Sequence, residues 1–465
     1  MKTLQRSRFA IALCAIGFAG FAASAAAADD TAAVIDDLKR RIDALEQQLK
    51  TQPAAPAAAG VTPAPATVAT VPAAQAGTNA KPDDFKVTWG GYVKLDVIAS
   101  RFSDAGVVQS TGRDFYLPNS IPVAAVENAR TYTDFSAKET RLFLKGDGNV
   151  LGHKIGAYVE FDFISGQISQ QAGVGAGNEA VTNAYNPAFR RGFITFDRWT
   201  FGQDWSTLQN LVALPDTLDF VAWPSEGTVF NRQPVIRYTV GGLAVALENP
   251  ETTVAARGGA AFVNTDDNTV PDLVAKYTLK TGFGDYTLSG VVRQLTARNT
   301  FAAAATPTTA AVAGVNDTTI GYGVSFAGKI PIFSKDDIRF TFSGGDGIGR
   351  YLAINTVGDA GVGANGRLHS VEIINGFVAY HHPWNEQWRT NVLVSAYHAN
   401  TGEVGLGTNF GTGVTRTVRS AAINLLYSPI PKLTLGGEYR HARRDTVGNL
   451  SGDLDRIQFS AKYSF

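Results

Sequence analysis

The sequence contains one cysteine in 465 residues, and that cysteine, Cys14, lies in a short apolar N-terminal segment. Without this segment the chain has no disulfide and no thiolate metal site. From Phe85 onward the chain also lacks an apolar run of the roughly 20 residues that a transmembrane helix requires. These absences exclude a disulfide scaffold, a cysteine-ligated metal protein and a bundle of membrane helices.

An excess of one charge is missing as well. The chain carries 41 basic and 41 acidic residues. Removal of residues 1–28 would take away Lys2, Arg6 and Arg8 and leave 38 basic residues against 41 acidic ones. A slightly acidic mature chain argues against nucleic acid as a partner.

Residues 1–28 have the three parts of a signal peptide. Basic residues come first, an apolar run follows at residues 9–23, and Ala26-Ala27-Ala28 precede Asp29 as a small-residue cleavage site. We therefore predict an exported protein. An uncleaved membrane anchor is the alternative, although the apolar run is short for one.

Two further segments precede the main domain. Residues 29–50 carry apolar positions spaced 3, 4, 3 and 4 apart, at Ile35, Leu38, Ile42, Leu45 and Leu49. This spacing predicts a coiled coil, and Ile at a with Leu at d favours a dimer. A single amphipathic helix lying on the rest of the protein is the alternative. Residues 51–82 contain six prolines among Ala, Thr and Val, which predicts an extended linker.

Residues 455–465 alternate with a period of two. One side is apolar from Ile457 to Phe465, and the other side holds Arg456, Gln458, Ser460, Lys462 and Ser464. This pattern predicts a β-strand with one apolar face and one polar face.

Segments of the same kind recur along the chain. We place sixteen strands near 85–101, 132–146, 152–164, 187–197, 198–205, 233–241, 242–250, 269–281, 284–298, 317–329, 336–347, 367–382, 386–399, 415–428, 431–444 and 454–465. Sixteen strands of about ten residues, an even number, are typical of an outer-membrane barrel. A soluble sandwich rarely has as many as sixteen strands. The fold class predicted for residues 83–465 is all-β, a transmembrane antiparallel β-barrel whose last strand pairs with its first.

The predicted connections alternate in length. Short ones at 197–198, 241–242, 281–285 and 428–431 are interleaved with long ones at 102–131, 165–186, 206–232, 299–316, 348–366 and 400–414. Outer-membrane barrels have short periplasmic turns and long external loops. Trp199, Trp384 and Trp388 lie at the short-turn ends, where a periplasmic aromatic girdle is expected.

The third long connection, residues 206–232, is unusually apolar, with Leu208, Leu211, Val212, Leu214, Leu218, Phe220, Val221 and Trp223. A 16-stranded barrel encloses a water-filled channel. We predict that this segment folds into the channel and narrows it, with Asp216, Asp219 and Glu226 at its polar edge. An external loop packed on its neighbours is the alternative.

Three stretches carry a family resemblance. WGGYVKLDVI (residues 89–98), FGQDWSTLQNLVALPDTLDF (201–220) and RQPVIRYT (232–239) resemble the DcaP-like outer-membrane porins. The resemblance implies a homotrimeric outer-membrane porin for anionic organic solutes, with dicarboxylates and aromatic diacids as the suggested class. It also implies an inward-folded third loop at 204–232, and it favours a trimer over the dimer indicated by the Ile/Leu seam.

The charge of the channel wall follows from strand parity, if the polar face of each strand points inward. Fourteen inward positions are basic: Lys86, Lys94, Arg141, Lys145, Lys154, Arg191, Arg237, Lys276, Arg293, Arg339, Arg389, Arg440, Arg456 and Lys462. Seven are acidic: Asp96, Glu160, Asp162, Glu248, Asp272, Glu372 and Glu438. A basic wall concentrates anions. The candidate solute contacts are Arg141, Arg191, Arg237, Arg293 and Arg339 on the wall and Arg232 at the loop's end.

Two other functions are alternatives to a selective porin. An outer-membrane enzyme would need grouped catalytic residues, but the six histidines, at 153, 369, 381, 382, 398 and 441, are scattered. The glycine-rich residues 343–349 precede no helix pattern, so no phosphate-binding loop is predicted. We predict no enzyme and no metal or other cofactor. The second alternative is a general, non-selective porin whose residues 29–50 contact peptidoglycan or a periplasmic protein. The expected surroundings of the barrel are outer-membrane lipid and lipopolysaccharide.

Overall fold

The computed structural model describes residues 85–104, 111–124, 128–164, 183, 185–221, 224–256, 261–302, 314–333, 335–402 and 413–465. These residues belong to one compact unit, residues 77–465. The predicted signal peptide (1–28), coiled coil (29–50) and linker (51–82) lie outside the described residues. Within the described ranges, no helix is both long and apolar enough to cross a membrane.

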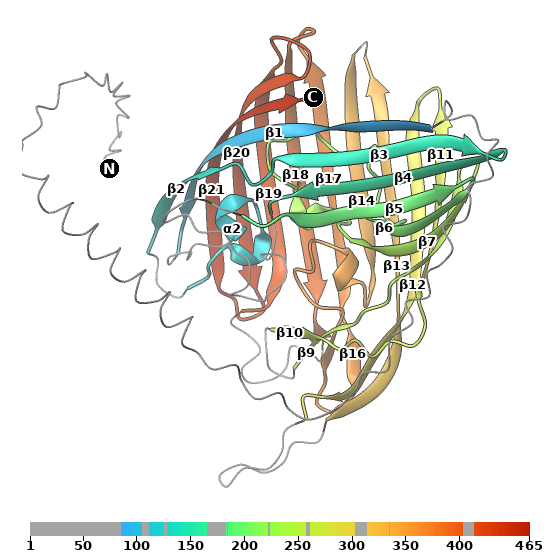
Figure 1. Ribbon diagram of the computed structural model, residues 1–465. Coiled ribbons are helices and arrows are strands. Elements are labelled where there is room, and N and C mark those ends of the chain that lie inside the picture. The colour runs from blue at the N-terminus through green and yellow to red at the C-terminus, as the bar shows by residue number, and fades with distance from the viewer. Residues whose placement is uncertain are drawn as a thin grey trace, which may run out of the picture. The chain divides into compact units, whose positions relative to one another are not determined.

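The unit is a closed antiparallel barrel (Figure 1). Its strands are β1 (Phe85–Phe102), β2 (Arg130–Ser136), β3 (Arg141–Val150), β4 (His153–Asp162), β5 (Ala188–Phe196), β6 (Trp199–Trp205), β7 (Arg232–Val240), β8 (Leu243–Glu248), β11 (Asp272–Thr281), β12 (Gly284–Thr300), β13 (Val315–Ile332), β14 (Asp336–Asp346), β17 (Glu372–Pro383), β18 (Trp388–Asn400), β19 (Thr415–Tyr427), β20 (Leu433–Thr446) and β21 (Ser451–Ser464). β2 and β3 both pair with β1 and occupy one place, so the barrel has sixteen strand positions. The predicted fold class is confirmed.

The first and last strands close the barrel. β1 pairs with β21 from Tyr92↔Ser464 to Phe102↔Leu454. The backbone N–H of Phe465 donates to Gly91 O at 3.1 Å, and the rings of Trp89 and Phe465 lie 5.5 Å apart. Over this stretch the edge of the first strand is paired with the edge of the last, as a membrane interior requires.

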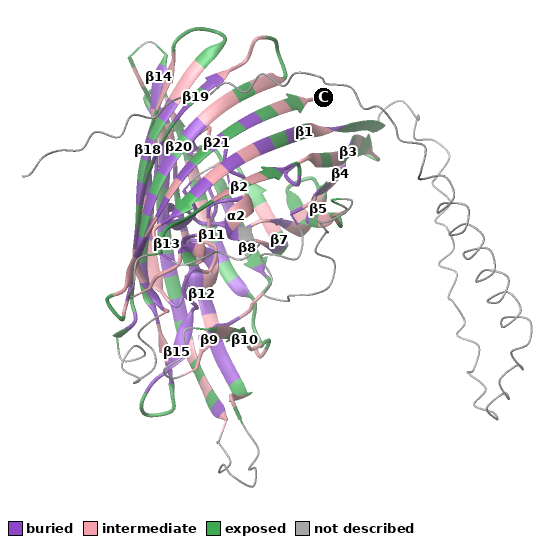
Figure 2. Cartoon of the chain, turned by 90° about the vertical axis from the view of Figure 1, so that its left-hand side faces the viewer, coloured by how far each residue is buried: buried purple, intermediate pink, exposed green. Residues whose placement is uncertain are grey.

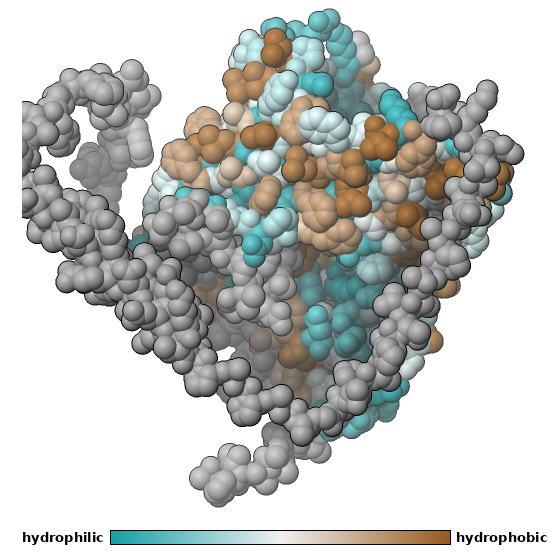
Figure 3. Space-filling model, in the orientation of Figure 1, coloured by the Kyte–Doolittle hydropathy of each residue, from teal (hydrophilic) through white to brown (hydrophobic). Residues whose placement is uncertain are grey.

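Burial alternates along the strands, as Figure 2 shows for β20, β21 and β1. On β19, for example, Val418, Ser420 and Ala422 are buried, whereas Ala421 and Ile423 are exposed. The exposed set is mostly apolar, and Figure 3 shows apolar residues gathered over β1, β3 and β4. An apolar outer band and a polar inner wall are what a barrel in lipid needs.

The connecting segments contain short elements of their own. The described helices are α2 (Thr111–Asp114), η2 (Pro118–Ser120), η3 (Ser225–Gly227) and η4 (Gly349–Tyr351). A small four-stranded sheet joins β9 (Thr253–Ala255), β10 (Phe262–Asn264), β15 (Ala360–Val362) and β16 (Leu368–Ser370). This sheet was not predicted, because strands of three residues are too short to show a period of two.

Candidate functional site

The segment between β6 and β7, residues 206–231, lies against the inner wall on the far side of the barrel. β6 and β7 are the fifth and sixth positions around the barrel, and β18 and β19 are the thirteenth and fourteenth. Asn391 on β18 and Asn424 on β19 each donate from Nδ2 to Asp216 O at 2.8 Å. The backbone N–H of Leu218 donates to Glu438 on β20 at 2.9 Å. The β6–β7 segment therefore reaches from one wall to the opposite one.

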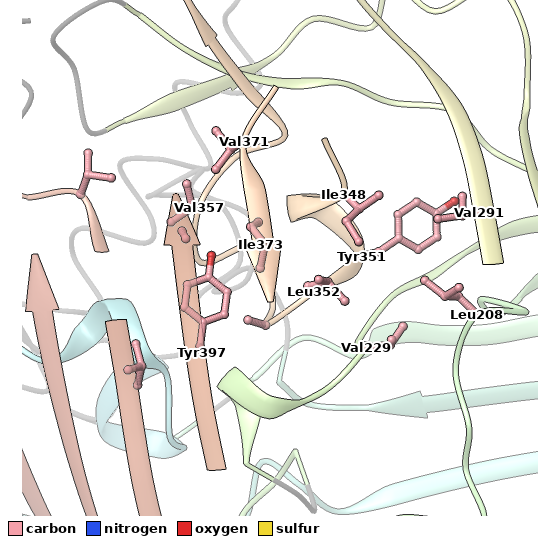
Figure 4. Packing of buried hydrophobic residues seen from close by; sticks show 14 of the residues in the cluster. Leu208, Val229, Val291, Ile348, Tyr351, Leu352, Val357, Val371, Ile373 and Tyr397 are labelled. Atoms are coloured by element: carbon pink, nitrogen blue, oxygen red, sulfur yellow. The ribbon is translucent and has the colours of Figure 1, made fainter. Parts of the chain in front are cut away.

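Most described apolar side chains of this segment are buried inside the barrel, whereas Leu211 and Val212 are about half exposed. Leu208 and Val229 belong to one buried cluster with Ile348, Tyr351 and Leu352 of the β14–β17 connection (Figure 4). Burial of such side chains supplies the main stabilising free energy for a loop held away from bulk water.

The three acidic residues of the segment differ in their partners. Asp216 accepts from Arg389 Nε at 2.6 Å. Asp219 is buried and accepts from the backbone N–H of Tyr116 at 2.9 Å. Glu226 is buried and accepts from the hydroxyl of Ser420. Burial, reinforced by the carboxylate of Glu226, raises the pKa of Tyr116 well above its ordinary value, so its phenol stays neutral. All three carboxylates thus bind the β6–β7 segment to neighbouring strands or loops.

Beside the start of the segment lies a hollow of about 190 Å³ whose charged lining comes from four strands. Arg191 on β5, Arg237 on β7 and Lys276 on β11 supply three cations, and Asp204 on β6 supplies one carboxylate. Asp204 accepts from Arg191 Nε at 2.8 Å and from Arg237 Nη1 at 3.0 Å. Lys276 Nζ donates to the backbone oxygen of Gln209 at 3.2 Å. The hollow therefore has an excess of two positive charges.

The structure brings Arg191 and Arg237 together and places the other candidate arginines elsewhere. Arg141 lies 3.5 Å from Asp162, and the guanidinium of Arg232 lies 5.2 Å from the ring centre of Trp205. Arg339 donates to Asp337 through Nε and Nη2 and from Nη1 to Leu214 O. Arg293 is fully buried against Asp272 and Asp359, between β12 and two loops.

The strand pattern missed several charged residues of the inner wall, among them Arg190 and Asp204. Arg190 pairs with both Glu160 and Asp162, because the register shifts by one residue between Glu160↔Arg191 and Phe161↔Phe189. Such a bulge puts two consecutive residues on one face. Asp204 was missed because β6 has polar residues on both of its faces near its end. Two adjacent arginines in an otherwise alternating strand are the signal that could have revealed the bulge.

We expect the β6–β7 segment to loosen when its amide anchors are removed. In Asn391→Ala plus Asn424→Ala, the two hydrogen bonds to Asp216 O and the one from Asp216 N–H to Asn391 Oδ1 are lost, each of about 0.5–1.5 kcal/mol. The expected result in single-channel recordings is a higher mean conductance with larger current fluctuations. Asn400→Ala is the matched control, since Asn400 is exposed and bonds to Glu372 instead. An unchanged current in the double variant would contradict this anchoring.

A closed sixteen-position barrel with an apolar outer band, a charged inner wall and an inner segment defines a porin-type channel of the outer membrane. The crystal structure of the outer membrane channel DcaP of Acinetobacter baumannii is similar, with a TM-score of 0.63 at 21% identity over 83% of this chain and 99% of that one. OmpT of Vibrio cholerae matches with a TM-score of 0.46 at 11% identity over 83% of this chain and 99% of that one. A search of curated protein sequences returned no match.

The model of the DcaP outer membrane protein family matches residues 167–465, which is more than half of the chain. The chain therefore belongs to the DcaP outer membrane protein family. The resemblance seen in the sequence is confirmed, and the protein is an outer-membrane channel.

Proposed function

We propose that the protein is a passive diffusion channel that prefers small anionic organic solutes, with dicarboxylates and aromatic diacids as the preferred class. The observation that carries this proposal is the hollow beside the inner segment, where Arg191, Arg237 and Lys276 face one carboxylate, Asp204. Two arginine forks can each take a carboxylate with two parallel hydrogen bonds. A solute with two carboxylates satisfies both forks and competes with Asp204 for them.

The surroundings of Arg191 support solutes that carry a ring. Its guanidinium lies 4.8 Å from the ring centre of Tyr158 and 5.2 Å from that of Phe193. The rings of Phe143 and Tyr158 are stacked at 5.7 Å, and those of Tyr158 and Phe193 at 5.4 Å. A flat aromatic diacid can place its ring on this aromatic strip while its carboxylates meet the cations.

Conduction also requires that a bound solute can leave. Asp204 helps here, because its carboxylate is ready to take back the arginines that the solute releases. The proposal includes no catalytic step and no cofactor. It also includes a homotrimeric assembly, which the family resemblance implies, with residues 29–82 in the periplasm.

The test is a reversal potential for purified protein in a planar bilayer under a KCl gradient, followed by addition of succinate or phthalate. We expect a reversal potential of the sign set by chloride and brief blockages of the single-channel current by the diacids. Chloride preference without blockage would indicate a general porin. A reversal potential set by potassium would contradict the proposal.

A further inference from the structure

A groove of about 970 Å³ runs over the outer face of the barrel between β12 and β19. Its walls are apolar side chains that point away from the lumen. Phe342, Ile374 and Val394 in these walls are each more than half exposed. Nothing in the channel mechanism uses this groove, because the solute passes on the other side of the sheet.

Small residues at neighbouring positions form the floor of the groove. Phe342 pairs with Gly376, Gly376 pairs with Ala396, and Ala396 pairs with Arg419, in one row across β14, β17, β18 and β19. A Cβ atom added to Gly376 would lie 2.6 Å from Thr341 O and 2.7 Å from the ring of Phe342. Along this row, the bulky side chain of Phe342 is followed by the two small residues Gly376 and Ala396, and the row ends at Arg419.

Arg419 is the charged end of the groove. It is exposed on the outer face, and within the described ranges its side chain has no hydrogen-bond or ion-pair partner. The residue directly across from it on β20 is another arginine, Arg443. Arg443 pairs with Asp445 on its own strand and with Asp453 on β21, each at 3.3 Å. Like charges directly opposite in a sheet repel each other, so an anion between them would stabilise this position.

The depth of Arg419 matches a lipid headgroup. Along the outward faces, the apolar band ends toward the long loops at Ala396, Ala421 and Ile457, and the next outward residues are polar: His398, Arg419 and Asp455. His398 lines the same groove and bonds to Thr417 through Nδ1 at 3.3 Å. A polar ring at this end of the barrel lies level with the outer leaflet.

We propose that this groove binds one lipopolysaccharide molecule of the outer leaflet. An acyl chain lies along the floor at Gly344, Gly376 and Ala396, and a phosphate of its lipid A sits between Arg419 and Arg443, within reach of His398. The apolar groove can hold the acyl chain, and the two facing arginines can bind the phosphate. A neutral phospholipid would fill the groove but would leave the repulsion between Arg419 and Arg443 uncompensated.

Native mass spectrometry of the detergent-solubilised protein with added lipid tests this proposal. The probes are bisphosphorylated lipid A and its dephosphorylated form. We expect the unmodified protein to bind the bisphosphorylated form about tenfold more tightly, as a charge-assisted contact implies. Arg419→Gln should remove this difference, and Ala396→Trp, which fills the groove, should weaken binding of both forms. Arg298→Gln is the matched control, an exposed arginine on β12 outside the groove.

Channel conductance should be unchanged in all three variants, which shows that the barrel is intact. Equal binding of the two lipid forms by the unmodified protein would overturn the proposal without any variant. A variant Ala396→Trp that separates the oligomer but retains lipid A would also overturn it, because the face would then contact a second copy of the chain.

Discussion

Neutralising Arg191, Arg237 and Lys276 together, each to Gln, is expected to lower the ratio of chloride to potassium permeability roughly tenfold or more. Two unit charges about 4 Å apart interact by about 4 kcal/mol at an effective dielectric constant near 20, and salt in the lumen screens part of this. The triple variant removes all three cations that line the hollow and leaves Asp204, so the local charge changes sign. The reversal potential in a KCl gradient measures the effect, and blockage by succinate or phthalate should disappear with it.

The matched control removes three basic residues that do not line the hollow, in Lys280→Gln, Arg298→Gln and Arg416→Gln. This variant should retain nearly the full chloride preference, because distant surface charges are screened. Asp204→Asn is expected to act in the opposite direction, since it frees Arg191 and Arg237 from their carboxylate. Equal loss of selectivity in the triple variant and the control would show that the hollow has no special role.

Arg293→Met is expected to cost about 3–5 kcal/mol of folding free energy, the usual penalty for breaking a buried ion pair on one side. The guanidinium of Arg293 is completely buried, 3.2 Å from Asp272 and 2.7 Å from Asp359, and it also donates to the backbone oxygen of Glu251. It therefore joins β12 to β11 and to two loops. Without it, Asp272 and Asp359 remain buried with one cation fewer between them.

The measurement is a urea unfolding curve of the detergent-solubilised barrel, followed by the electrophoretic shift between folded and unfolded forms. Arg298→Met is the control on the same strand, because Arg298 is exposed and should change stability by less than about 0.5 kcal/mol. A stability of Arg293→Met equal to that of the control would mean that the ion pairs contribute no net free energy.

The strands could be predicted from the sequence because each inner-wall residue alternates with a lipid-facing one. The segment 284–298 became β12 at Gly284–Thr300, and 415–428 became β19 at Thr415–Tyr427. The segment 132–146 shows where the pattern is too coarse. It forms β2 and β3 with a break at residues 137–140, and Lys138 within the break binds Asp114 at 2.9 Å. Period-two alternation contains no information about such a contact.

The candidate site was harder to predict, because parity shows which way an arginine points but not which residue it meets. Arg237 and Arg293 both occupy inward positions of their strands. Arg237 lines the hollow beside Asp204, whereas Arg293 is enclosed by residues from two loops. That difference depends on how loops far apart in the sequence pack together. The bulge at Arg190 is a second limit, since one inserted residue reverses the parity of the remainder of a strand.

Because β1 and β21 pair with each other, the barrel can close only when the first and the last strand are both in place. Asp96 and Ser460, which face each other across the seam, are 364 positions apart. Pairing of such distant strands is slow, because loop-closure entropy is lost before the contacts form. Until β21 has paired with it, β1 presents an unpaired edge to which a strand of another chain can add. The free edge of the first strand therefore needs protection until the last strand has closed the barrel.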